Sequence, residues 1–400
     1  MNIVMGIMNI VLGIAFGYLA ICILYNFVFA ISAQFRNLKK YTSCTKKNNF
    51  AILIPTYKDN NVILNTVNNV LRQDYPADKY QVIVIADQLD SEILVELSRL
   101  PIRLITVSFS KSTKAKSLKF ALAQLPCNIY DSILILDSDN LLEKGCLEKA
   151  NHALNDGYKM VQLHRTAKNK NTATAILDAI SEEVGNAIHR EGQRALGFSA
   201  TLIGSGMAFD FNIFKSIMMN LDIEGNPAED REINTEFLRR GYKCEYIEDA
   251  LVFDEKVASN FILQQQRTRW ISAQFMYARK FWLKELKKTI TTNANYLNYA
   301  LQTLILPRSM LIVTTFFLGI VSLLLLLWNK KIYLGPIHWL CLLIIMIVSI
   351  SISIGNNISK SEFKTALLHF PITFIAFFKA FRKSSSRQSD FIHTPKEFVN

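Results

Sequence analysis

The sequence predicts an α/β domain, with a mostly parallel sheet flanked by helices, held between transmembrane helices at both ends of the chain. Two observations predict this fold class. Between residues 48 and 255, short runs of branched aliphatic residues alternate with helical patterns, which is typical of βαβ units and a parallel sheet. Long uncharged segments lie before and after this region, and each exceeds the roughly 20 apolar residues that span a bilayer.

The first element is a transmembrane helix over residues 1–35, because no charged side chain precedes Arg36. A cleaved signal peptide is the alternative. It is disfavoured because the segment lacks a basic leading region and its apolar stretch is too long. By the positive-inside rule, the basic residues that follow place the next segment in the cytoplasm; these are Arg36, Lys39, Lys40, Lys46 and Lys47.

The domain at residues 48–255 begins with strands and helices in alternation. We expect strands at 50–57, 80–87, 102–109 and 131–139, with helices at 60–73, 91–100 and 115–125. Asp87 and Asp137 each directly follow an apolar strand, so polar chemistry is concentrated at one edge of the sheet. The sequence has no P-loop and no GxGxxG after a strand, which argues against kinases, ATPases and dinucleotide-binding proteins.

The stretch ILILDSDN at 133–140 ends a buried strand in two carboxylates. Like charges this close repel one another unless a positive charge lies between them. We therefore expect Asp137 and Asp139 to hold a divalent cation, Mg²⁺ or Mn²⁺, at the mouth of the sheet. An Asp-rich turn without a ligand is the alternative.

Three later stretches also carry polar groups. The Gly-Ser-Gly run at 204–206 predicts a turn where backbone can approach a ligand closely. Glu229 and Asp230 precede a helical pattern, where simple charging of a helix N-terminus is the alternative reading. The run QQQRTRW at 264–270 opens a basic amphipathic segment, and a purely membrane-facing surface is its alternative.

The rest of the chain divides into three segments. Residues 256–295 are expected to form amphipathic helices in the membrane interface. Two transmembrane helices follow within 300–357, where uncharged runs lie between Arg308 and Lys330 and between Lys331 and Lys360. Residues 358–400 combine an interface helix with a basic cytoplasmic tail, because their fourteen-residue apolar stretch is too short to cross a bilayer.

Composition excludes several classes of function. The net charge is +12, and much of the excess of basic residues lies beside the apolar segments. Basic residues are expected there because they set membrane topology and bind anionic lipid, so we expect no nucleic-acid partner. The six cysteines show no CxxC or Cys/His ligand spacing, which predicts free thiols in a reducing cytosol. The predicted spans contain no Asp, Glu, Lys or Arg, so a transporter or channel is disfavoured.

The order of DxD, an acidic pair and QxxRW between these membrane flanks resembles the membrane-integrated family-2 glycosyltransferases, the group containing cellulose and hyaluronan synthases. The resemblance covers the whole chain and reaches FIHTPK at 391–396, similar to the Thr-Pro-Lys tail of many members. It implies a GT-A catalytic domain on the cytoplasmic side of the inner (plasma) membrane. It also implies inverting, metal-dependent transfer from a nucleotide sugar, expected to be a UDP-sugar, to a polysaccharide or lipid-linked acceptor. Secretion of a polymer would need a homo-oligomer or a membrane partner, because three transmembrane helices are fewer than such synthases usually carry.

Carried over residue by residue, the resemblance assigns roles to the donor side of the site. Thr56 and Tyr57 in PTYKD would lie near the nucleobase, and Asp87 would read the base or ribose. Lys114 would lie near the nucleotide. Asp137 and Asp139 match DxD, with Asp139 the better candidate for direct metal coordination and Asp137 also touching the ribose or a bound water.

The resemblance also assigns the acceptor side, where Asp230 would be the general base. The residues implied to contact acceptor or diphosphate are Gly204, Ser205, Gly206, Glu229, Gln266, Arg269 and Trp270. This chain departs from the family pattern in several places. Lys58-Asp59 replaces Asn-Glu, Thr113 replaces a glycine, Lys119 replaces an asparagine, Ala228 replaces a threonine, and Asp210 stands where many members have a basic residue. The changes at Lys58-Asp59 and Ala228 support the alternative of a catalytically inactive, membrane-anchored nucleotide-sugar-binding protein.

Overall fold

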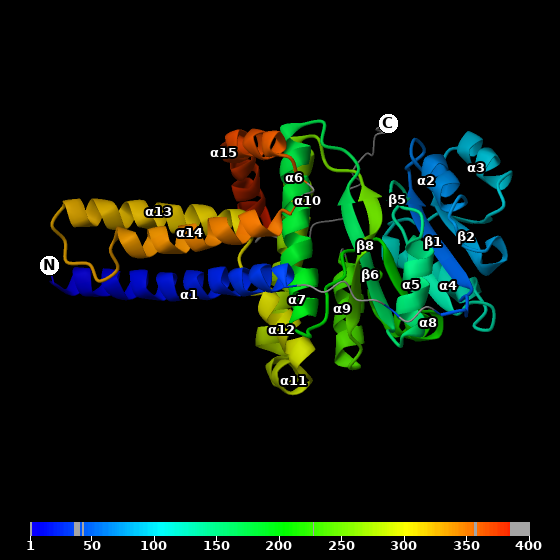
Figure 1. Cartoon of the computed structure of the whole chain (residues 1–400), viewed down its shortest axis with the longest axis horizontal. Coiled ribbons are helices and arrows are strands. Elements are labelled where there is room, and N and C mark those ends of the chain that lie inside the picture. Colours follow the sequence, from blue (N-terminus) through cyan, green and yellow to red (C-terminus); the bar gives the residue numbers. More distant parts are fainter. Residues whose placement is uncertain (1, 36–40, 42–43, 227, 356–357, 385–400) are drawn as a thin grey trace.

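The computed structural model describes residues 2–35, 41, 44–226, 228–355 and 358–384 (Figure 1). In these residues one mixed sheet has the strand order β3-β2-β1-β4-β7-β6-β8-β5. The strands are β1 (Phe50–Tyr57), β2 (Tyr80–Asp87), β3 (Arg103–Val107), β4 (Ser132–Ile135), β5 (Leu141–Leu142), β6 (Met160–Ala167), β7 (Met207–Asp210) and β8 (Cys244–Asp254). The bounds predicted for β1 and β2 are confirmed, whereas β3 and β4 are shorter than expected.

The predicted α/β fold class is confirmed, with a parallel half and a mixed half in the same sheet. Strands β3, β2, β1 and β4 are parallel neighbours, as are β6 and β8. Strand β7 enters antiparallel between β4 and β6, and β5 pairs antiparallel with β8. The parallel half brings the carboxyl ends of β1, β2 and β4 to one edge, where Tyr57 lies opposite Asp87.

Helices cover both faces of the sheet because the strand residues that alternate between the faces are apolar on each. Leu53, Ile83 and Ile133 pack on one side with helices α4, α8 and α9. Ile52 and Val84 pack on the other side with α2, α3 and α5. The helices are α2 (Ile63–Val70), α3 (Ser91–Ser98), α4 (Lys114–Gln124), α5 (Cys146–Asn155), α8 (Phe211–Asn220) and α9 (Glu229–Arg239).

Three helices of the described chain are long and apolar enough to cross a membrane: α1 (Asn2–Gln34), α13 (Arg308–Leu327) and α14 (Pro336–Ser353). They lie side by side and extend together away from the sheet, with the N-terminal end of α1 farthest from it (Figure 1). Leu19, Leu311 and Trp339 are among the buried side chains that join them. The outer surfaces of these helices expose large apolar side chains, as a lipid-facing bundle requires.

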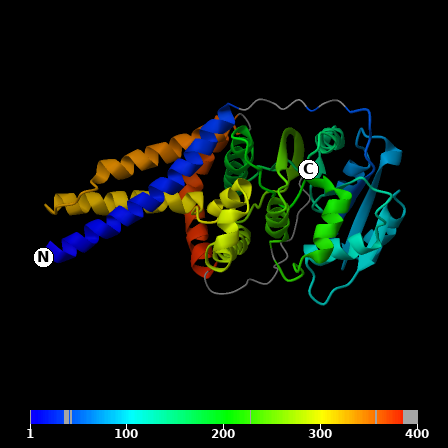
Figure 2. The same ribbon diagram turned by 90° about the horizontal axis from the view of Figure 1, so that it is seen from below.

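A layer of helices joins the bundle to the sheet domain. It consists of α6 (Ala173–Asn186), the π-helical turn η2 (Ala187–Glu191), α7 (Gly192–Ala195), α10 (Asn260–Arg279), the π-helical turn η3 (Lys280–Lys284), α11 (Leu286–Thr291), α12 (Ala294–Gln302) and α15 (Lys360–Ser384). Figures 1 and 2 both show α15 between the bundle and the sheet domain. Tyr277 and Phe281 are buried in the core of the sheet domain, and Phe275 contacts Phe381 of α15. The location of residues 256–295 and of α15 in the membrane interface stays a prediction, and FIHTPK lies outside the described residues.

Candidate active site

The carboxyl ends of β1, β2 and β4 open into a cavity of about 1440 Å³. Most of the residues assigned above line this cavity, although they come from segments far apart in the sequence. They are Tyr57, Asp87, Lys114, Asp137, Asp139, Gly204, Glu229, Asp230, Gln266, Arg269 and Trp270. Thr56, Ser205 and Gly206 are absent from the lining: Thr56 is buried and donates a hydrogen bond to the Ile54 carbonyl at 3.2 Å.

Hydrogen bonds from three directions hold the loop that carries Asp137 and Asp139. Beside Asp137, the backbone N–H donates to the Ser205 hydroxyl at 2.9 Å. The Ser138 hydroxyl donates to Asp59, one of the residues that depart from the family pattern. At the far end of the loop, Asn140 donates to Asp254 at 2.8 Å and accepts from Ser205 at 2.6 Å. The loop is therefore fixed before any ligand binds, which is the condition for placing two carboxylates against one ligand.

Lys114 links the donor and acceptor sides of the cavity. It is the first residue of α4, a helix capped by the Thr113 hydroxyl. Its ammonium group forms an ion pair with Asp137 and donates to the Gly204 carbonyl at 2.6 Å. The same ammonium lies 4.0 Å from a carboxylate oxygen of Glu229. One positive charge therefore serves two acidic groups, and substituting it would leave both without their shared counter-charge.

The turn at 204–206 positions other groups by close backbone approach. Both glycines have positive φ, +88° at Gly204 and +65° at Gly206. The Gly206 N–H donates to the carbonyl of Ile135 at the end of β4, at 2.9 Å. A Cβ added at Gly206 would lie 2.9 Å from Val252 Cγ2, closer than side chains normally approach. The structure thus gives this turn a positioning role, with Ser205 between its two glycines fixing the backbone of Asp137.

Glu229 and Asp230 begin α9 and face the cavity beside the glycine turn. A Cβ added at Gly204 would lie 3.7 Å from Asp230 Oδ2, which shows how near this carboxylate is to the turn. Asp230 Oδ1 accepts a hydrogen bond from the Arg231 N–H at 2.8 Å, as an acid at a helix N-terminus can. Burial raises the pKa of Glu229 to about 7, the charge of Lys114 opposes this rise, and the charge of Asp230 adds to it.

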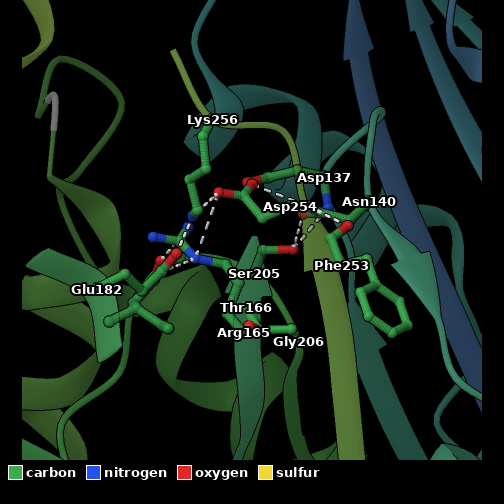
Figure 3. A network of polar contacts seen from close by, with 12 residues as sticks. Asp137, Asn140, Arg165, Thr166, Glu182, Ser205, Gly206, Phe253, Asp254 and Lys256 are labelled. Carbon is green, nitrogen blue, oxygen red and sulfur yellow. Dashed lines mark hydrogen bonds and ion pairs between the residues drawn. The ribbon is translucent and has the colours of Figure 1, made fainter. Parts of the chain in front are cut away.

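Asp254, at the end of β8, is a cavity acid that the sequence analysis missed. Burial raises its pKa to about 7; Arg165 opposes this, and the charge of Asp139 adds to the rise. Figure 3 shows Asp254 in a network with Lys256, 2.6 Å away, and with Arg165 and Glu182. The signal in the sequence is short, because Asp254 follows only the four apolar residues at 250–253, in a strand that also contains three other acids.

The carboxylates fit a cation that is shared with a ligand. In the part of the chain that the structure describes, no three His, Cys, Asp or Glu side chains lie close enough to form a metal site by themselves. Mg²⁺ usually takes one or two carboxylates and completes its shell with water and substrate phosphates. Asp137 and Asp139 supply oxygen ligands of that kind and number, so they fit Mg²⁺ or Mn²⁺ held jointly with a phosphorylated ligand.

The QxxRW motif lies on α10, on the side of the cavity opposite the sheet. Gln266, Arg269 and Trp270 line the cavity, and the Gln266 side-chain oxygen is buried without a hydrogen-bond partner in the described chain. The Arg267 guanidinium lies 4.2 Å from the centre of the Trp270 ring and pairs with Asp178. Arg267 is only 8% exposed, so the motif faces the interior of the protein and is not a purely membrane-facing surface.

Comparisons with known proteins agree with this architecture. The family model described as glycosyltransferase like family 2 matches residues 48–273. Among solved structures, the mannosyltransferase PcManGT from Pyrobaculum calidifontis, in complex with GDP-Man and Mn²⁺, has a TM-score of 0.57 at 14% identity, covering 94% of this chain and 99% of that chain. Residues 1–349 of TarS from S. aureus have a TM-score of 0.42 at 15% identity, covering 84% and 89%. Among curated proteins, no sequence matches the chain.

The PcManGT structure informs the fold, and the family model informs the family. The likeness to PcManGT concerns the fold alone and confirms the predicted GT-A type of domain. The family model covers more than half of the 400 residues and includes every candidate site residue named above. The chain therefore belongs to the family-2-like glycosyltransferases, and it is a glycosyltransferase.

Proposed function

We propose that this enzyme is a membrane-integrated member of its family, of the cellulose and hyaluronan synthase type. It would transfer a sugar, with inversion, from a nucleotide sugar to a lipid-linked or polysaccharide acceptor at the cytoplasmic face of the inner membrane. The observation that carries the proposal is that one continuous cavity joins the acidic edge of the sheet to the apolar ends of the membrane helices. The proposed enzyme has an N-terminal transmembrane helix at 1–35, a catalytic domain at 48–255 and interface helices at 256–295. Two transmembrane helices at 300–357 and an interface helix with a basic tail at 358–400 follow.

Asp87 supports a nucleotide on the donor side. Its side chain is 1% exposed, and neither carboxylate oxygen has a hydrogen-bond partner among the described residues. Buried carboxylates without donors are unfavourable and rare. Hydroxyl groups of a ribose, or N–H groups of a base, would satisfy these oxygens, and Tyr57 lies opposite on the neighbouring strand. We expect uridine as the nucleoside.

The diphosphate is expected between the DxD loop and α10. Asp137 and Asp139 would hold Mg²⁺ or Mn²⁺, which when bound neutralises the charge of the leaving diphosphate. The PcManGT complex with GDP-Man and Mn²⁺ supports this pairing of nucleotide sugar and divalent cation. Lys114 adds a further positive charge beside Asp137. On α10, Arg269 would bind phosphate through its planar fork of donors, and Trp270 would offer an apolar face to a sugar ring.

Asp230 is proposed as the general base. The acceptor hydroxyl must lose its proton as the new glycosidic bond forms, and a positioned carboxylate contributes a factor of about 10²–10⁴ to such a step. Attack on the face opposite the leaving nucleotide inverts the anomeric carbon, so no second carboxylate nucleophile is required. Glu229, which lines the cavity and has a raised pKa, would donate a hydrogen bond to the acceptor or diphosphate.

Transfer from radiolabelled donors tests this proposal. Membranes containing the full chain are supplied with UDP-, GDP- and dTDP-sugars, and the products are identified by mass spectrometry. Asp139→Asn and Asp230→Asn should each abolish transfer, whereas Asp249→Asn, whose side chain is 58% exposed on β8, should match the unmodified enzyme. Unchanged turnover in both site variants would overturn the assignment. Binding of UDP without transfer from any donor would favour the inactive sugar-nucleotide-binding protein instead.

A further inference from the structure

Two arginines meet at the membrane end of the cavity. Arg190 lies in the π-helical turn after α6, and Arg308 is the first residue of α13. Gly185 lies between them: a Cβ added there would be 3.7 Å from a guanidinium nitrogen of each arginine. The two guanidinium groups therefore lie close together and repel each other, and burial away from water strengthens that repulsion.

No acidic side chain of the described chain forms an ion pair with either arginine. Burial lowers the pKa of Arg190, although the charge of Asp230 favours the charged form of Arg190 and opposes this fall. Arg190 donates to the Thr201 carbonyl and to the Asn186 side chain, each at 3.0 Å. Arg308 donates to the carbonyl of Ser181 at 2.6 Å. These acceptors are all neutral, and neither arginine forms an ion pair within the described residues. Nearby Arg267, in contrast, is paired with Asp178.

Neutral polar groups beside the arginines also have no partner. His189 Nδ1 and the Ser309 hydroxyl are buried atoms without a hydrogen bond in the part of the chain that is described, and both residues line the cavity. Burial lowers the pKa of His189 well below its usual range, and the charges of Arg308 and Arg190 lower it further. His189 is therefore neutral at pH 7 and can donate a hydrogen bond. Ser309 lies in the first turn of α13, where a helix favours an anion.

The walls beyond the arginines are apolar. Ile312 of α13 and Ile350 of α14 line this end of the cavity, as do Phe363 and Leu367 of α15. Leu367 is also 64% exposed, so this apolar wall reaches the surface of the protein. Figures 1 and 2 show that α13, α14 and α15 meet at the junction of the bundle and the sheet domain.

We propose that this end of the cavity binds the phosphate group of a lipid acceptor, with the phosphate between Arg190 and Arg308 and the apolar chain between α13, α14 and α15. Guanidinium forks match the oxygens of a phosphate and bind them in pairs. A neutral lipid or a neutral sugar chain has no charge that would compensate two arginines. The role of the lipid as acceptor rests on the proposed function, whereas binding of the phosphate does not.

Binding of farnesyl phosphate to the full chain in detergent tests the inference, with farnesol and inorganic phosphate as separate probes. We expect saturable binding of radiolabelled farnesyl phosphate, with farnesol and inorganic phosphate each about tenfold weaker or more, because the site needs both the charge and the chain. Arg308→Gln should weaken binding of farnesyl phosphate by roughly 10- to 100-fold, and Arg308→Lys by less. Arg279→Gln, which removes an exposed guanidinium from α10 outside the cavity, should bind as the unmodified protein does.

Equal binding of farnesol and farnesyl phosphate would overturn the inference, and so would unchanged binding of farnesyl phosphate by Arg308→Gln. The comparison of probes uses the unmodified protein, so it decides the question even if Arg308→Gln does not fold. UDP binding by Arg308→Gln reports whether the donor side is intact. Loss of lipid-phosphate binding and loss of sugar transfer are measured separately, so failure of one proposal is distinguishable from failure of the other.

Discussion

Replacing Gly206 with alanine tests whether the glycine turn fixes the geometry of the site. The new methyl group would lie 2.9 Å from Val252 Cγ2 and 3.4 Å from Leu163 Cβ, both on strands of the sheet. Gly204→Ala is the matched control, because it also has positive φ but meets only Asp230 Oδ2, at an ordinary 3.7 Å. The two variants differ in crowding and share the same change in the unfolded chain.

The magnitudes follow from these contacts. A left-handed backbone conformation costs a residue with a Cβ about 1–2 kcal/mol, which applies to both variants. Overpacking against the two strands adds about 1–3 kcal/mol for Gly206→Ala alone. At about 2–4 °C for each kcal/mol in a domain of this size, Gly206→Ala should melt about 2–12 °C below Gly204→Ala.

Thermal unfolding of the detergent-solubilised protein, followed by intrinsic fluorescence, measures this difference. We also expect Gly206→Ala to bind UDP more weakly than the unmodified protein, because the neighbouring Ser205 accepts the hydrogen bond from the Asp137 N–H. A melting temperature for Gly206→Ala equal to or above that of Gly204→Ala would refute the argument that the turn is tightly packed against the sheet.

Three further predictions concern the charges of the cavity. Lys114→Met should weaken UDP binding about tenfold or more in calorimetry, because it removes the ammonium that pairs with Asp137; Lys116→Met, outside the cavity on the same helix, should not. Because the pKa of Glu229 in the folded protein is about 7, above the unfolded value, the folded state holds a proton that the unfolded state has lost between about pH 4.5 and 7. Stability should therefore fall as pH rises through this window, by up to about 3 kcal/mol, and Glu229→Gln should remove that part of the slope in melting curves. EDTA should abolish sugar transfer without unfolding the protein, and Mn²⁺ or Mg²⁺ should restore it.

Each of these predictions has a result that would contradict it. Equal losses of UDP affinity in Lys114→Met and Lys116→Met would show that the pairing with Asp137 is unimportant for the nucleotide. If Glu96→Gln, at an exposed control position, flattened the pH dependence of stability as much as Glu229→Gln, the burial of Glu229 would not be the cause of that pH dependence. Transfer that continues at full rate after chelation, with the chelator in excess, would rule out a divalent cation in the reaction.

Local pattern was sufficient to predict the parallel half of the sheet and the acids at its edge. The strands at Phe50–Tyr57 and Tyr80–Asp87 are buried on both faces, so continuous apolar runs mark their bounds. An acid directly after such a strand must lie at the carboxyl edge, which is why Asp87 and Asp137 were found. The rule does not mark Asp254 as clearly, because its strand also contains Glu245, Glu248 and Asp249.

Features that depend on packing between distant segments could not be predicted. Strand β7 pairs antiparallel between β4 and β6, a choice that no local pattern specifies. Thr56 was expected near the nucleobase, yet its side chain is buried against its own strand and lies off the cavity. Arg190 and Arg308 are more than a hundred residues apart, and they meet only because Arg308, at the start of α13, reaches α6, where it donates to the Ser181 carbonyl.

The central claim is that Asp139 helps to hold a cation for the nucleotide while Asp230 acts on the acceptor. Calorimetry of UDP binding, with Mn²⁺ and with EDTA, tests it most directly on three proteins. Mn²⁺ should strengthen UDP binding equally in the unmodified enzyme and in Asp230→Asn, and it should have no effect in Asp139→Asn. If Mn²⁺ strengthens UDP binding as much in Asp139→Asn as in the unmodified enzyme, the claim is contradicted.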